Sequence, residues 1–168
     1  MHGTLTYNTH PSLDDALAFR DQVYASGGAV VPFVIKTAES RSLDEDAREG
    51  FADTHIELIQ FAVGSNGSGV AFPWEGRYRE IAGDILRSPN TKCGHNAWLF
   101  DQRVLKAARA REGLDLNCRG AVHDTPQMFH HWQPALPAHL QFAASFICLP
   151  FPWKHLTATV QPHCHGKL

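Results

Sequence analysis

The residues of this sequence with the clearest potential for chemistry stand at the ends of two predicted elements. The apolar run Ala29–Ile35 predicts a buried strand, which continues into Lys36 and Ala38. Catalytic carboxylates are often placed at the end of an interior strand, yet this strand delivers an amine and a methyl group. Farther along, Asp101 falls in the first turn of a predicted helix, where the helix dipole stabilises a negative charge. One carboxylate and one amine are therefore the first candidate pair.

Apolar periodicity and turn signals predict the elements that must position these residues. Ser12 is a good N-cap for the first helix. Pro32 predicts a bulge or an edge position in its strand, because proline cannot donate to a sheet ladder. The expected strands are 4–7, 29–35, 55–63, 70–73 and 121–123, with a short segment at 91–95, and the expected helices are 12–25, 77–87, 98–111, 126–132 and 136–147. A hairpin that leads into alternating strands and helices predicts an α/β domain with a mixed sheet.

The composition is that of an ordinary globular domain. The 168 residues are 43% apolar and 19% charged, with a net charge of −2. No apolar run approaches the roughly 20 residues that cross a membrane, and the N-terminus lacks a signal-peptide layout, so we expect one cytoplasmic domain over residues 1–168 without membrane contact. The net charge of −2 argues against a protein that coats duplex DNA, but not against a local site for the end of one strand. His163, Cys164 and His165 are either zinc ligands or an exposed chain end.

The segment Gly94–Leu105, GHNAWLFDQRVL, resembles the second motif of DnaQ-like 3′–5′ exonucleases, in which an Asn precedes an Asp at the start of a helix. The spacing of Asn96 and Asp101 is similar to that in the proofreading domains of bacteriophage-type family A DNA polymerases. The later block HDTPQMFHHWQPALPAHLQFAAS, followed by WKH, resembles the region after this motif in the same enzymes. The strand IELIQFAVG and its partner ending in FPW also resemble that family, so the resemblance spans roughly residues 29–155.

This resemblance implies an RNase H-like α/β fold, with a mixed central sheet flanked by helices. The family hydrolyses the terminal phosphodiester of a single-stranded 3′ end with two divalent metals. Its metal ligands are two carboxylates from a DxE at the end of the first core strand, one from the second motif and one from a final helix. Two hard cations about 4 Å apart activate water and stabilise the leaving oxygen, and they need oxygen ligands of high negative charge.

The sequence departs from this pattern at the carboxylates. In the family's register the DxE falls on Lys36, Thr37 and Ala38, so both acids of the first motif are replaced. A shift of one residue would offer Glu39, but it would turn the side chains to the opposite face of the strand. No Asp or Glu follows residue 124, so the third motif is absent as well. Asp101 alone matches a metal ligand of the family.

Asp101 has two interpretations. It is either the relict of a metal site, at most a weak ligand, or a first-turn acid that the helix dipole stabilises. Because an ammonium repels divalent cations, we hypothesise that Lys36 occupies the place of a metal and neutralises Asp101. At about 4 Å and an effective dielectric of about 20, such a pair gains roughly 4 kcal/mol before desolvation is counted. No cofactor is expected on this hypothesis, whereas Mg²⁺ or Mn²⁺ would serve an active enzyme.

The second motif and its helix supply four candidates for contact with nucleic acid: His95, Asn96, Trp98 and Arg103. A structural role competes for each of them. His95 and Asn96 are also candidate helix caps, Trp98 is a candidate for packing, and Arg103 for a solvated helix face. Asp124, at a strand end, is expected to serve a turn or a cap.

Three functions are consistent with these residues. The preferred one is a catalytically impaired exonuclease-like domain, a pseudoenzyme, that binds a single-stranded 3′ end of nucleic acid or a replication protein. The second is an active Mg²⁺- or Mn²⁺-dependent 3′–5′ exonuclease with unusual ligands or a completing partner. The third is a protein-interaction module on the exonuclease fold.

Overall fold

The computed structural model describes residues 6–38, 51–63 and 68–147. They divide into two compact units, one up to Asp124 and one from Thr125 onward. The first unit contains a sheet with helices, and the second contains two short helices. The two units are considered separately below.

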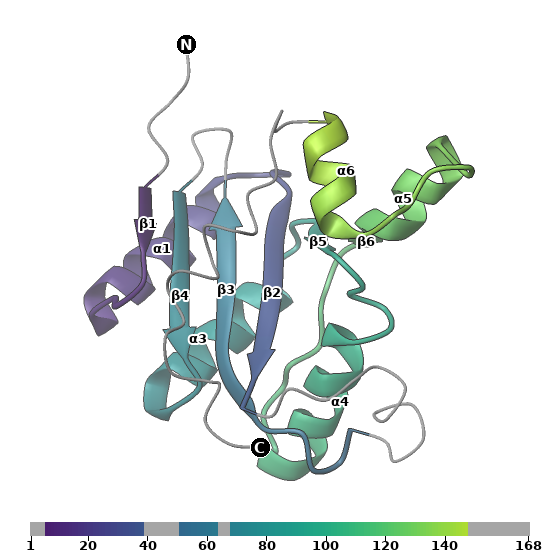
Figure 1. Ribbon diagram of the computed structural model, residues 1–168. Coiled ribbons are helices and arrows are strands. Elements are labelled where there is room, and N and C mark those ends of the chain that lie inside the picture. The colour runs from purple at the N-terminus through teal and green to yellow at the C-terminus, as the bar shows by residue number, and fades with distance from the viewer. Residues whose placement is uncertain (1–5, 39–50, 64–67, 148–168) are drawn as a thin grey trace, which may run out of the picture. The chain divides into compact units, whose positions relative to one another are not determined.

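The first unit is built on a six-stranded mixed sheet in the order β1-β4-β3-β2-β5-β6 (Figure 1). β2, β3 and β4 form an antiparallel meander, whereas β1 pairs with β4 and β5 with both β2 and β6 in parallel. The strands are β1 (Thr6–Asn8), β2 (Val31–Thr37), β3 (Ile56–Val63), β4 (Ser68–Pro73), β5 (Lys92–Gly94) and β6 (Val122–Asp124). The expected α/β fold with a mixed sheet is confirmed.

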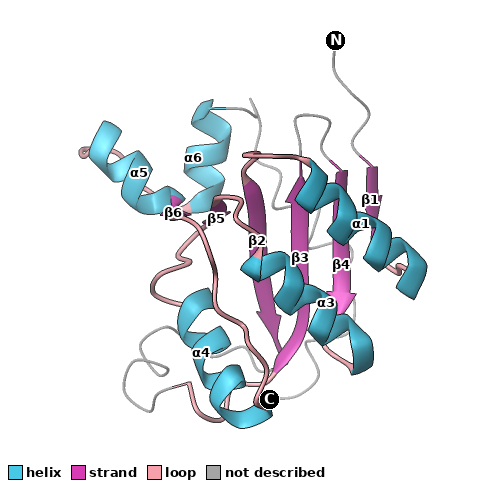
Figure 2. Ribbon diagram, turned by 180° about the vertical axis from the view of Figure 1, so that it is seen from behind, coloured by secondary structure: helices cyan, strands magenta, loops and turns pink. Residues whose placement is uncertain are grey.

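Two helices, α1 (Leu13–Ala25) and α3 (Gly76–Arg87), cover one face of the meander (Figure 2). The core lies beneath them: Phe72 of β4 is fully buried, and its ring contacts the rings of Phe19, Phe61 and Tyr78 at centroid distances of 5.9–6.4 Å. On the opposite face of the meander, Figure 1 shows no helix among the described residues of this unit. Val34 of β2 is accordingly 47% exposed.

The cap of α1 confirms the prediction made from Ser12. Its hydroxyl accepts the backbone N–H of Asp15 at 3.1 Å, and the Asp15 carboxylate accepts the backbone N–H of Ser12 at 3.0 Å. This reciprocal pair is a capping box, which satisfies two donors at the helix start that no intrahelical carbonyl reaches. The helix therefore begins one residue after the predicted cap.

Pro32 occupies an edge position locally, as predicted, because it pairs with β5 but lies outside the ladder with β3. β2 is an interior strand, between β3 and β5. The ladder with β3 extends from Phe33 to Thr37 and thus stops one residue after Pro32, where the missing N–H costs no ladder hydrogen bond. The irregularity of this ladder lies at the other end of the strand, between Lys36 and Thr37.

Helix α4 (Asp101–Glu112) begins three residues later than expected, and Gly113 ends it with the left-handed φ of 69°. The second unit consists of α5 (Thr125–Trp132) and α6 (Leu140–Ile147). Aromatic rings join these two helices: Phe129 of α5 meets Phe142 and Phe146 of α6 edge to face, at 6.2 and 5.9 Å. Both helices match segments predicted from the sequence, although α6 is four residues shorter at its start.

Candidate functional site

Asp101 lies at the first turn of α4 and contacts the end of β2. Its carboxylate accepts the backbone N–H of Ile35 at 2.8 Å. β5 pairs with β2 only at Val31 and Pro32, so the Ile35 N–H lies beyond that ladder and Asp101 supplies the acceptor that a strand would have supplied. The sequence therefore identified correctly that the second motif and the first core strand meet here.

Burial dominates the electrostatics of Asp101. Its residue surface is only 2% exposed, and this desolvation raises the pKa of the carboxyl from 3.8 to about 6. The hydrogen bond from Ile35 opposes this effect, and the nearby carboxylate of Asp124 adds to it. Near neutral pH, Asp101 is thus an anion held in a poorly solvated position.

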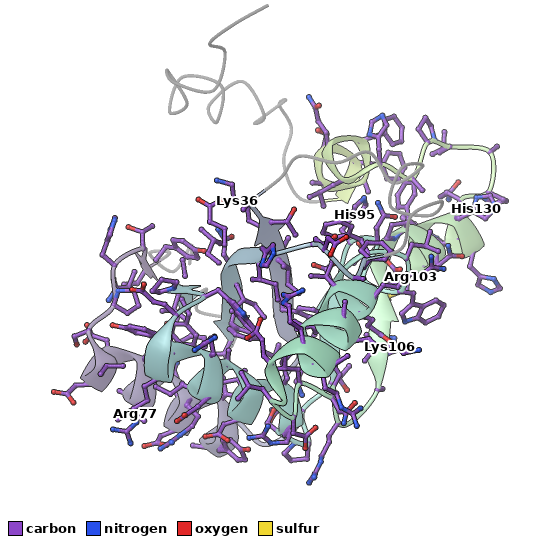
Figure 3. All side chains as sticks on the ribbon, turned by 90° about the horizontal axis from the view of Figure 1, so that it is seen from below. Lys36, Arg77, His95, Arg103, Lys106 and His130 are labelled. Atoms are coloured by element: carbon purple, nitrogen blue, oxygen red, sulfur yellow. The ribbon has the colours of Figure 1, made fainter. Side chains whose placement is uncertain are left out.

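Lys36 does not neutralise Asp101, so the hypothesis of an ion pair between them is wrong. Side chains alternate along β2: Phe33 and Ile35 are buried, whereas Lys36 projects from the other face of the strand. The Lys36 ammonium lies 3.1 Å from the carboxylate of Glu57 on β3, and its side chain is 52% exposed. Figure 3 shows Lys36 at the end of β2, pointing away from α4 and from Arg103.

Ala38 continues the contact between β2 and the segment before β3. Its backbone N–H donates to the carbonyl of His55 at 3.0 Å, and its methyl group is exposed. Glu39, the acid offered by the shifted register, lies outside the described residues. The first-motif positions in the described part of the chain therefore present an ammonium and a methyl group, as expected from the sequence.

Asp124 organises the loop before α4, which confirms the turn role among the two roles expected for it. One carboxylate oxygen accepts the backbone N–H of Asn96 at 2.8 Å, and the other accepts that of Trp98 at 3.1 Å. Asp124 is 2% exposed, so both hydrogen bonds are shielded from water. The loop needs this support because Asn96 adopts a left-handed φ of 65°, which is uncommon for a residue with a side chain.

The four candidate contact residues have different environments. Asn96 does not cap α4 with its side chain, because the N-cap is Phe100 and no side-chain cap bond forms there; instead the Asn96 carbonyl accepts the N–H groups of residues 99 and 100. Trp98 is 51% exposed, and its indole N–H donates to the carbonyl of Val122 at 3.2 Å. Arg103 is exposed on α4, and His95 lies in the loop that Asp124 holds. The structure thus brings all four to the N-terminal end of α4.

Lys92 is a buried charged residue that the sequence did not single out. Its ammonium is fully buried on β5 and donates to the carbonyls of Ser88, Asn90 and Arg119 at 2.8, 2.7 and 3.2 Å. Burial lowers the pKa of this amine, since desolvation disfavours its charged form. A lysine on a short strand ordinarily indicates a solvated side, so the sequence carried no signal for this arrangement.

The described residues at this site do not fit a pair of divalent metals. Asp101 already uses an oxygen to accept the Ile35 N–H, and Lys36 and Ala38 at the end of β2 offer an ammonium and a methyl group. Hard cations need several oxygen ligands of high negative charge, which an ammonium and a methyl group do not supply. Among residues 6–38, 51–63 and 68–147, no three His, Cys, Asp or Glu side chains gather closely enough to hold a metal ion.

Solved structures share this architecture. The Nibbler EXO domain of Aedes aegypti matches with a TM-score of 0.62 at 11% identity, covering 99% of this chain and 82% of that one. Trypanosoma brucei RNase D in complex with RNA U12 matches with a TM-score of 0.62 at 11% identity, covering 94% of this chain and 51% of that one. Escherichia coli RNase D, an exoribonuclease involved in structured RNA processing, matches with a TM-score of 0.52 at 14% identity, over 85% of this chain and 33% of that one.

These matches establish the class of fold: the chain has the DnaQ-like, RNase H-like fold of 3′–5′ exonuclease domains. It spans a third of the length of Escherichia coli RNase D and about half of that of the Trypanosoma brucei enzyme. No protein-family model and no curated protein sequence matches it. In the part of the chain that the structure describes, no helix combines the length and apolar character needed to span a membrane.

Proposed function

We propose that this chain is a nucleic-acid-binding domain of the 3′–5′ exonuclease type whose hydrolytic site is impaired. The observation that carries this proposal is the state of Asp101, the one acid that matches the family's ligands. It is buried, and its carboxylate serves as the acceptor for the backbone of β2. Asp101 thus joins α4 to the sheet, a structural role that does not depend on a metal.

The positions beside Asp101 support the same conclusion. A two-metal mechanism needs carboxylates from the first core strand to bridge the cations. Lys36 and Ala38 stand at those positions, and Lys36 is already paired with Glu57. A phosphodiester bound here would meet no pair of carboxylates from β2 that could hold metals and activate water.

The proposed ligand is a single-stranded 3′ end. The fold is shared with RNases of the RNase D type, one of which is described in complex with RNA. The spacing of Asn96 and Asp101 resembles that in the proofreading domains of bacteriophage-type family A polymerases. A relationship of this chain to those domains is therefore part of the proposal. On this view a replication protein is the proposed protein partner and the cytoplasm the proposed compartment.

The test uses 3′-labelled single-stranded RNA and DNA oligonucleotides with Mg²⁺ or Mn²⁺. The expected result is retention of the oligonucleotide, weakened by salt, without shortening. Shortening that persists in the purified protein and disappears in Asp101→Asn would contradict impairment and support an active exonuclease. If the protein neither retains nor shortens any strand, nucleic-acid binding itself is refuted.

A gain-of-function variant sharpens this test. Lys36→Asp combined with Ala38→Glu restores the acids of the first motif, and the matched control is Lys36→Asn with Ala38→Gln. If the fold still places these positions as in active relatives, the acidic variant alone should gain Mn²⁺ binding. Equal behaviour of the two variants would show that more than these two side chains has been lost.

A further inference from the structure

The outer face of α4 carries an excess of positive charge. Four cations stand on this helix, Arg103, Lys106, Arg109 and Arg111, although the whole chain has a net charge of −2. The two acids of the helix do not balance them at the surface. Asp101 is buried, and Glu112 already accepts hydrogen bonds from other side chains. A local field of this sign attracts anions.

Two of the four cations are explained by the fold. Arg109 donates to the side-chain oxygen of Asn117 at 2.8 Å, and Arg111 donates to the carbonyl of Ala52 at 3.0 Å and to Glu112 at 3.3 Å. Both also stand in the last turn of α4, where the helix dipole stabilises positive charge. These residues therefore stabilise the protein without any ligand.

Arg103 and Lys106 have no such explanation. Within residues 6–38, 51–63 and 68–147, neither takes part in an ion pair or a side-chain hydrogen bond. Arg103 stands in the first turn of α4, where the positive end of the helix dipole disfavours a cation. Because the two residues are three positions apart, their side chains emerge on the same helix face, about 5–6 Å apart at Cβ. An anionic ligand would supply the missing partner for both.

The surface beside these cations is hollowed on both sides of α4. One hollow, of about 650 Å³, is lined by Phe51, Ala107 and Ala110 and also by Arg103 and Lys106. The other, of about 270 Å³, lies between α4 and residues 116–122 and is also bordered by Lys106. Lys106 therefore borders both an apolar hollow and a more polar one.

We propose that this outer face of α4 binds single-stranded nucleic acid, with phosphates against Arg103 and Lys106 and a base over the apolar hollow. This inference rests on the proposed function and adds a second contact area beyond the loop that carries His95 and Asn96. Surfaces that bind single strands combine cations for the backbone with apolar faces for the bases. Arg103, Lys106 and the apolar hollow beside them provide this combination, whereas an acidic peptide would use the cations alone.

The proposal is tested by binding of a fluorescein-labelled oligouridylate of about 12 nucleotides to the full chain, measured by anisotropy at several salt concentrations. Arg103→Gln and Lys106→Gln are compared with Arg77→Gln, which removes the same charge from an exposed position on α3. Figure 3 shows Arg77 at the opposite end of the view from Arg103 and Lys106. All three residues are exposed, so circular dichroism should show unchanged folding.

Each α4 substitution should raise Kd about fivefold to tenfold and lower the salt slope by about 0.7, the value for one phosphate of a single strand. Arg77→Gln should change Kd less than twofold, as expected for a general charge effect alone. Equal weakening by all three substitutions would overturn the proposal, because only total charge would then matter. Equally strong competition by poly-glutamate of matched charge would also overturn it, since the base would then contribute nothing.

The outcomes separate this inference from the proposed function. Oligonucleotide binding by the wild-type chain that is insensitive to Arg103→Gln and Lys106→Gln overturns the α4 surface and leaves the proposed function standing. Absence of any binding by the wild-type chain overturns both.

Discussion

Replacing Asp101 by Asn should make the protein more stable near neutral pH and change how its stability depends on pH. The buried carboxyl has a pKa of about 6, compared with 3.8 in a solvated chain. Between these two values the folded state binds more protons than the unfolded state, so the free energy of unfolding falls as the pH rises. Asparagine keeps the shape and can still accept the Ile35 N–H, but it has no charge to bury.

The size of the effect follows from the two pKa values. Their difference, at about 1.4 kcal/mol for each pH unit, corresponds to a penalty of about 3 kcal/mol for the ionised form above pH 6. The wild type is free of this penalty below pH 3.8 and bears it fully above about pH 6. The difference in stability between Asp101→Asn and the wild type should therefore grow by about 2–3 kcal/mol between about pH 4 and pH 7.5.

Urea denaturation followed by tryptophan fluorescence at four pH values across this range measures the difference directly. The other carboxylates titrate in both proteins, so their effect cancels in the difference between the two free energies of unfolding. Any cost of the asparagine amide that does not depend on pH changes this difference by the same amount at every pH. Asp53→Asn, at an exposed position, is the control and should follow the wild type. A difference between Asp101→Asn and wild type that does not vary with pH would refute the argument that burial controls Asp101.

Three further substitutions test other contacts of the described residues. Asp124→Ala removes the acceptor of two shielded N–H groups and should cost about 2–4 kcal/mol of unfolding free energy, whereas exposed Asp53→Ala should cost less than about 0.5. Lys92→Met removes the donor to three carbonyls, those of Ser88 and Asn90 in buried hydrogen bonds, and should lower the free energy of unfolding measured with urea by about 2–4 kcal/mol; Lys36→Met, which breaks a surface pair, should cost less than about 1 kcal/mol. Gly120→Ala should destabilise by more than about 1 kcal/mol in thermal unfolding, because φ is 78° and the new Cβ would lie 2.7 Å from a backbone oxygen. If a variant and its control lost the same unfolding free energy, the stabilising role assigned to that contact would be wrong. The same holds for Gly120 if Gly120→Ala leaves the stability unchanged.

Much of the fold could be predicted because local patterns and tertiary packing agree. The N-cap Ser12, the apolar strand β3 and the hairpin to β4 all lie where the pattern placed them. The short strands β5 and β6 were located only approximately, since three residues carry little periodicity. The edge position predicted from Pro32 is local, because the ladder with β3 does not include this residue, whereas the interior place of β2 in the sheet had no signal in the sequence.

The candidate site was harder to predict, because it depends on the direction of side chains. The motif correctly brought Asp101 to the end of β2, but the partner of Lys36 depends on which face of the strand it occupies. Lys36 and Ile35 point to opposite faces, so the lysine meets Glu57 of the neighbouring strand. The contacts of Lys92 were beyond sequence analysis, as its three carbonyl partners come from two separate segments of the chain.

The burial of Lys92 gives the protein an internal reporter of its own opening. Amine-directed reagents such as acetic anhydride modify accessible, deprotonated lysines, and Lys36 is open to solvent whereas Lys92 has no exposed surface. Modification of Lys92 therefore requires that residues 88–92 separate from residue 119, which breaks the junction of α3, β5 and the strand that follows. Mass spectrometry of the peptide that contains Lys92, with Lys36 as the internal reference, would measure how often this part of the sheet opens under native conditions.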